Sequence, residues 1–117
     1  MSPTPIQIWH NPRCSKSRQT LALLEQQDQP IEIIKYLDTP PSQPALEQVL
    51  RLLALSPRQL IRTGEAEYKA QGLAQADDAT LLQAMLNTPK LIERPIVLAN
   101  GKAAIGRPPE AVLAILS

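Results

Sequence analysis

The alternation of apolar and polar residues predicts a strand, a helix and a second strand in the first third of the chain. Ile6 and Ile8 alternate with a polar residue, which is the period of a strand, and Asn11-Pro12 is a turn signal that ends it. Apolar residues then recur at helical spacing and predict a helix from about residue 15 to residue 27. Residues 31–37, which are rich in β-branched side chains, read as the second strand. Because a helix connects them, the two strands are expected to pair in parallel with a right-handed crossover.

The middle of the chain, from about residue 42 to residue 88, is predicted to be entirely helical. Apolar residues recur there at spacings of three and four, and Ser42, Ser56 and Asp77 stand where helix-capping side chains are expected. One short helix in this block is expected to contain Leu60-Ile61-Arg62.

The last third of the chain returns to strands. Residues 95–99 and 102–105 are separated by Asn100-Gly101, the strongest short hairpin signal, and a final helix is predicted over residues 110–116. The order of elements indicates an α/β, thioredoxin-like fold. Its four-stranded mixed sheet would carry an all-helical insertion between the second and third strands, within a single domain over residues 1–117.

Composition narrows the classes of function. The net charge of +1 leaves no large basic surface for nucleic acid, and three aromatic residues are too few for a base-stacking surface. No apolar run approaches the roughly 20 residues that span a bilayer, and the first five residues lack the features of a leader. With one cysteine the chain forms no internal disulfide, which favours a reducing, cytoplasmic location.

That single cysteine, Cys14, is the first candidate for chemistry. It stands at the predicted start of the first helix, where unpaired N–H groups and the helix dipole favour an anion. Arg13, Lys16 and Arg18 add positive charge nearby, and such surroundings lower a thiol pKa from about 8.5 to roughly 3.5–7.5. A lone cysteine is often a buried, inert core residue, but these polar neighbours argue against core burial.

Three arginines and one histidine are further candidates. Arg94 precedes Pro95 at a strand start, Arg107 lies in the turn after the hairpin, and Arg62 lies in the inserted block. Each taken alone is typical of a solvated surface residue, yet the topology brings Arg94 and Arg107 towards the first strand–helix turn. His10 is either a hydrogen-bonded histidine at a strand end or a residue that helps to hold Cys14 as a thiolate.

Two other kinds of site are not indicated. His10 and Cys14 alone cannot make a zinc site, which needs about four ligands, so no metal is expected. No glycine-rich phosphate loop is present.

Five segments spread over nearly the whole chain carry a resemblance to a known family: residues 10–18, 36–41, 60–62, 93–97 and 105–110. In this order and taken together, they resemble the ArsC family, the glutaredoxin-coupled arsenate reductases, and most closely their short bacterial branch.

The resemblance implies a role for each candidate residue. Cys14 would be the nucleophile that attacks arsenate or a similar oxyanion, and His10 would favour its thiolate. Arg62, Arg94 and Arg107 would bind the oxyanion. The resemblance also implies a cis peptide bond between Arg94 and Pro95, facing the thiol. The supporting residues are Asn11, Ser17, Arg18 and Pro95.

The resemblance further implies a reaction without a bound cofactor. A thioester-like arsenate adduct would form on Cys14, glutathione would act as co-substrate and form a mixed disulfide with Cys14, and glutaredoxin would resolve that disulfide. The cysteine count agrees, because a chain with one thiol must borrow the resolving thiol.

Three other functions are alternatives. The first is a glutathione-dependent thiol-disulfide oxidoreductase acting on protein or small-molecule disulfides. The second is a non-enzymatic regulator resembling the Spx type, whose Cys-x-x-Cys switch is impossible here because Ser17 replaces the second cysteine. The third is a low-molecular-weight phosphatase, which fails because its Cys-x5-Arg loop needs an arginine where Thr20 stands.

Overall fold

A computed structural model of the protein describes residues 5–116. The predicted lack of a leader concerns residues 1–5, of which residues 1–4 lie outside the described part. The chain divides into two compact units, which are described separately below. The first comprises the described residues up to Thr39 together with those from Arg94 onward, and the second spans Pro40–Glu93.

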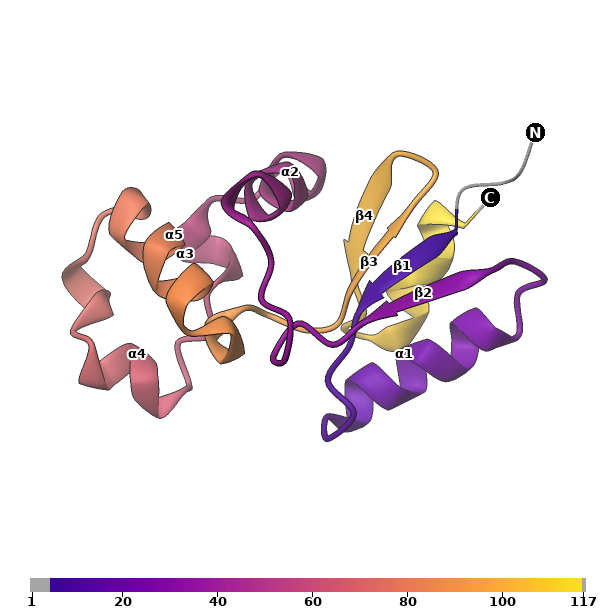
Figure 1. Cartoon of the computed structure of the whole chain (residues 1–117), viewed down its shortest axis with the longest axis horizontal. Helices are drawn as coiled ribbons and strands as arrows, with labels where there is room; N and C mark the ends of the chain where they lie inside the picture. The colour runs from indigo at the N-terminus through magenta and orange to yellow at the C-terminus, as the bar shows by residue number, and fades with distance from the viewer. Residues whose placement is uncertain (1–4, 117) are drawn as a thin grey trace. The chain divides into compact units, whose positions relative to one another are not determined.

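The first unit is built on a four-stranded mixed sheet (Figure 1). β1 pairs in parallel with β2 and antiparallel with β3, which in turn pairs antiparallel with β4. The order across the sheet is β2-β1-β3-β4, and the helical segment lies between β2 and β3 in sequence. This confirms the predicted fold. The strands are β1 (Ile6–Trp9), β2 (Ile31–Ile34), β3 (Ile96–Ala99) and β4 (Lys102–Ile105).

The hairpin between β3 and β4 forms as the Asn100-Gly101 pair predicts, since both residues adopt left-handed backbone conformations with φ of 54° and 73°. β2 is shorter than predicted and ends at Ile34, whose carbonyl oxygen accepts a hydrogen bond from the N–H of His10. The chain turns directly afterwards, because the Lys35 carbonyl accepts hydrogen bonds from two N–H groups three and four residues later.

Two helical elements pack together against the sheet of the first unit: α1 (Ser15–Glu25) and η3 (Pro109–Ile115) (Figure 1). The final helix predicted over residues 110–116 forms at Pro109–Ile115, and it is a 3₁₀ helix. Its N–H groups bond three residues back, as in the bond from Ala111 to the Pro108 carbonyl. The buried apolar cluster of this unit comprises Ile6, Ile8, Leu24, Val97, Ala99, Val112, Ile115 and Leu116.

The second unit is helical, as predicted. The side chains of Ser42, Ser56 and Asp77 each accept a hydrogen bond from a backbone N–H in the first turn of the helix that follows. None of the helices within residues 5–116 is long and apolar enough to cross a membrane. The elements are α2 (Gln43–Leu53), α3 (Pro57–Leu60), α4 (Ala66–Ala70), η1 (Leu73–Gln75), α5 (Asp78–Asn87) and η2 (Pro89–Leu91).

The prediction that Ile61 and Arg62 belong to a short helix is wrong. α3 ends at Leu60, and the extended residue Ile61 forms an antiparallel bridge with Ile92. The Arg62 N–H donates to the Leu91 carbonyl at 2.7 Å, so the backbone follows a strand-like pairing that suits a β-branched residue.

Candidate active site

Cys14 caps the N-terminus of α1 from an extended backbone conformation, as the sequence predicts. Its N–H donates to the Asn11 carbonyl at 3.0 Å, and its own carbonyl accepts from the N–H of Arg18 at 3.0 Å. The prediction that polar neighbours keep Cys14 out of the interior is wrong, because the residue is only 9% exposed. It is nevertheless absent from the apolar cluster of this unit, since polar groups gather around its sulfur.

The loop before Cys14 is held by three side chains expected to support the site. The Asn11 side-chain oxygen accepts from the N–H of Arg13 at 3.0 Å. The fully buried Ser17 hydroxyl accepts from the N–H of Asn11 at 3.0 Å. The Arg18 guanidinium donates to the Pro12 carbonyl at 2.9 Å. Together these bonds fix the backbone that presents the thiol.

His10 lies at the end of β1 and is 6% exposed. Its Nδ1 is hydrogen-bonded to the Ser17 hydroxyl at 2.7 Å. Burial lowers the pKa of the His10 imidazole below its usual 6.5, and the positive charges of Lys35 and Arg18 lower it further. A neutral ring is therefore favoured at neutral pH, and any influence of its ring on Cys14 passes through Ser17.

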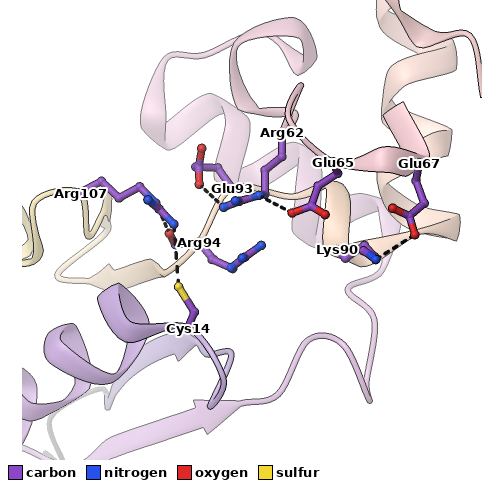
Figure 2. A network of polar contacts seen from close by, with 8 residues as sticks. All are labelled: Cys14, Arg62, Glu65, Glu67, Lys90, Glu93, Arg94 and Arg107. Carbon is purple, nitrogen blue, oxygen red and sulfur yellow. Dashed lines mark hydrogen bonds and ion pairs between the residues drawn. The ribbon is translucent and has the colours of Figure 1, made fainter. Parts of the chain in front are cut away.

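Arg107 reaches the sulfur from the other end of the chain (Figure 2). Its Nη2 lies 3.8 Å from Cys14 Sγ, within hydrogen-bonding range for sulfur, and its Nε donates to the Arg94 carbonyl at 2.8 Å. The predicted cis bond between Arg94 and Pro95 is confirmed. A second cis bond, between Arg107 and Pro108, was not anticipated, and nothing in the sequence singles it out.

Gly106 permits these segments to approach one another, a function that the sequence analysis missed. Its N–H donates to the Pro95 carbonyl at 2.9 Å. A β-carbon at this position would collide with the Thr20 hydroxyl on α1 and would lie 2.7 Å from Pro95 Cγ. The sequence did contain a signal for this role, because Gly106 stands between a predicted strand and Arg107. A glycine at such a position often allows two backbone segments to approach closely.

The pKa of the Cys14 thiol results from opposing effects. Burial raises it, but hydrogen bonds from the backbone N–H of Ser17, from the Arg94 guanidinium and from the backbone N–H of Lys16, together with the positive charge of Arg94, outweigh burial and hold the pKa below its ordinary value. The prediction that the charges of Arg13, Lys16 and Arg18 lower this pKa is wrong. The structure attributes the lowering to Arg94 and to the helix N-terminus, because Lys16 acts through its backbone.

Arg62, the third predicted arginine, belongs to the second unit. Its Nε pairs with Glu65 at 3.1 Å and its Nη1 with Glu93 at 2.8 Å (Figure 2). Its side chain is 21% exposed. These two carboxylates hold the guanidinium in one orientation within its unit, and its role towards an oxyanion stays a prediction.

The arrangement in the first unit is suited to nucleophilic attack on an anion. A thiol with a lowered pKa lies beside two guanidinium groups, which present forked donors to oxyanions. Within residues 5–116, no group of three or more histidine, cysteine or acidic side chains is placed to hold a metal ion.

Comparison with known proteins places this site in a family. Residues 9–115 match the ArsC family. The chain belongs to the ArsC family. A protein named arsenate reductase from Neisseria meningitidis serogroup A is 50% identical over 114 residues, covering 95% of this ArsC family member and 97% of that protein. YfgD of Escherichia coli K12, described as uncharacterised, is also 50% identical over 114 residues, with coverages of 95% and 96%.

A solved structure has the same fold as this ArsC family member. The structure described as arsenate reductase from Vibrio cholerae matches with a TM-score of 0.92 at 49% identity, and it covers 99% of this chain and 100% of that one.

Proposed function

We propose that this protein is an arsenate reductase that uses glutathione and glutaredoxin, with Cys14 as its nucleophile. The observation that carries the proposal is the convergence of Arg94 and Arg107 on a thiol whose pKa is lowered. Relatives that are half identical over nearly the full length bear the name arsenate reductase, which supports arsenate as the oxyanion.

In the first step the Cys14 thiolate attacks arsenic. A sulfur–arsenic bond forms, and an arsenate oxygen leaves as water after taking up a proton. Arg94 and Arg107 neutralise the charge on the remaining oxygens, because guanidinium groups stay protonated at any physiological pH. The product is a thioester-like adduct in which arsenic is still pentavalent.

In the second step glutathione attacks the Cys14 sulfur. The sulfur–arsenic bond breaks, arsenic keeps the electron pair and leaves as arsenite after taking up the thiol proton, and a Cys14–glutathione disulfide forms. Two electrons reach arsenic, one from each thiol. Glutaredoxin then takes the glutathione by thiol–disulfide exchange and restores Cys14. Because the cycle depends on these reduced thiols, a cytoplasmic location is part of the proposal.

The remaining predicted residues have supporting roles in this proposal. His10 acts through Ser17, whose hydroxyl it binds and whose backbone N–H stabilises the thiolate. Asn11 and Arg18 keep the loop in place, and the Pro95 carbonyl, which accepts from the Gly106 N–H, holds the segment that carries Arg94. Arg62 is proposed as the third oxyanion ligand, on the strength of the family resemblance alone.

The proposal is tested by measuring arsenate turnover with glutathione and glutaredoxin for the wild type, Cys14→Ser and Arg107→Leu. We expect Cys14→Ser to abolish turnover while remaining folded, and Arg107→Leu to lose arsenate turnover while still reducing small disulfides. Arg51→Leu, which removes an exposed arginine of α2, serves as the control. Turnover in the Cys14→Ser variant would refute the mechanism. Equal losses of arsenate and disulfide reduction in Arg107→Leu would favour the disulfide oxidoreductase instead.

A further inference from the structure

A cavity of about 350 Å³ lies beside the loop that precedes Cys14. One wall is formed by the four residues 10–13 and the other by Lys35, Leu37 and Asp38, which follow β2. All of these residues belong to the first unit. The volume falls within the range of about 300–1,000 Å³ typical of small-molecule sites, and the proposed arsenate chemistry at Cys14 does not use this cavity.

The charges of the cavity form a specific set. Arg13 and Lys35 are exposed cations, Asp38 is an exposed anion, and the remaining polar wall is made by the buried His10 and Asn11. Glutathione carries two carboxylates at its two ends and one ammonium group, which is the complementary set. Its apolar methylene groups match Pro12 and the 40% exposed Leu37.

We propose that this cavity is the binding site for glutathione, with Lys35 and Arg13 paired to its carboxylates and Asp38 to its ammonium group. That the ligand is glutathione rests on the proposed function. The new part is which residues bind glutathione.

The cavity adjoins the loop that leads to Cys14. Pro12 and Arg13 line it and are the two residues directly before Cys14. Successive Cα atoms are about 3.8 Å apart, and an extended tripeptide is roughly 10 Å long. Glutathione bound along this wall is therefore long enough to extend from Arg13 to Cys14, as the proposal requires.

The site is tested by a reaction that needs no arsenate. The Cys14 thiolate attacks one sulfur of oxidised glutathione, the disulfide bond breaks, and a Cys14–glutathione disulfide forms. The second glutathione leaves as a thiolate with the electron pair and takes up a proton from water. One disulfide is exchanged for another, so no further oxidant is required.

The experiment measures the rate of this exchange by mass spectrometry on the full chain. Oxidised glutathione is compared with hydroxyethyl disulfide, which is uncharged, and with dithiodipropionate, which has carboxylates but no ammonium group. We expect Lys35→Glu to slow the reaction with oxidised glutathione roughly fivefold, as suits the loss of an exposed ion pair, and to leave hydroxyethyl disulfide unchanged. Lys102→Glu, an exposed lysine at the start of β4, makes the same change in net charge away from the cavity and is the control.

The Asp38→Asn variant distinguishes specific binding of the ammonium group from general electrostatic attraction of an anionic substrate. Oxidised glutathione is an anion, so general attraction would make its reaction faster when a negative charge is removed. Loss of the ammonium contact would instead make the reaction with oxidised glutathione about two- to fivefold slower. The reaction with dithiodipropionate, which has no ammonium group, would not become slower. A faster reaction in Asp38→Asn, or equal effects of Lys35→Glu and Lys102→Glu, would overturn the site. A protein without arsenate turnover that still shows the predicted pattern would refute the proposed function and leave the site intact.

Discussion

At the residue scale, Ser17 holds together the loop that precedes Cys14. Its hydroxyl, with no exposed surface, connects the ring of His10 to the N–H of Asn11, and its own N–H lowers the pKa of Cys14. From the sequence, the helix start beside Cys14 could be predicted, because it depends on local pattern. The burial of Cys14 could not be predicted, and neither could the lowering of its pKa by Arg94, because both depend on packing against segments that lie far away in sequence.

Replacing Ser17 with Ala is expected to destabilise the protein. The variant leaves the buried Asn11 N–H and the His10 ring without their shared partner, and an unsatisfied buried polar group costs roughly 1–3 kcal/mol. Urea denaturation measures this loss. Ser15→Ala removes an exposed hydroxyl at the start of the same helix and is expected to change stability by less than about 0.5 kcal/mol. Equal stability of the two variants would contradict the structural role of Ser17.

The lowered pKa of His10 gives stability a defined pH dependence. Below its usual pKa of 6.5 the imidazole binds a proton more readily in the unfolded chain than in the folded one, so protons favour unfolding. The free energy of unfolding is therefore expected to fall as the pH is lowered from 6.5 through the folded-state pKa. Urea denaturation between about pH 7 and pH 5 should show this fall in the wild type and a smaller one in His10→Gln. The same slope in both proteins would exclude His10 as its source.

At the scale of elements, the site depends on how closely the Arg94–Pro95 segment, the end of β4 and α1 approach one another. The strands of the hairpin and three helix caps could be predicted, because each follows from residues within a few positions of one another. The 3₁₀ form of η3 and the strand-like path of Ile61 could not. Ile61 pairs with Ile92, a partner 31 residues distant, which no local pattern contains.

Gly106→Ala is expected to disturb this packing. The added methyl group would meet Thr20 and Pro95, and overpacking of a close contact costs typically about 1–3 kcal/mol. Gly64→Ala is the matched control, because a β-carbon at Gly64 has open space around it. Thermal and urea denaturation of both variants measure the difference. A Gly106→Ala protein as stable as the Gly64→Ala protein, with Cys14 equally reactive, would show that the close approach is dispensable.

At the scale of the whole molecule, the chain consists of a sheet unit that carries the thiol and a helical unit that carries Arg62. The sequence predicted the helical segment over about residues 42–88, because apolar residues recur there at spacings of three and four, but it predicted one domain and not two units. It did not predict that Arg62 pairs with both Glu65 and Glu93, since the second pairing follows from the bridge between residues 61 and 92.

Arg62→Ala tests whether the helical unit takes part in the reaction. We expect arsenate turnover to fall by at least about tenfold, the effect of losing one charged hydrogen bond to the oxyanion. The alkylation rate of Cys14 should keep its pH dependence, because the groups that lower the thiol pKa are Ser17, Arg94 and Lys16. Full turnover in Arg62→Ala would restrict the oxyanion site to the sheet unit.

If Arg94 and the start of α1 stabilise the thiolate of Cys14, its alkylation rate must rise with pH at a midpoint below that of an ordinary thiol. The rate of iodoacetamide modification is measured against pH for the wild type and for Arg94→Leu. We expect a wild-type midpoint below the ordinary thiol value of about 8.5 and a higher midpoint in the variant. A wild-type midpoint at or above that value, or no change on removing Arg94, would contradict this stabilisation.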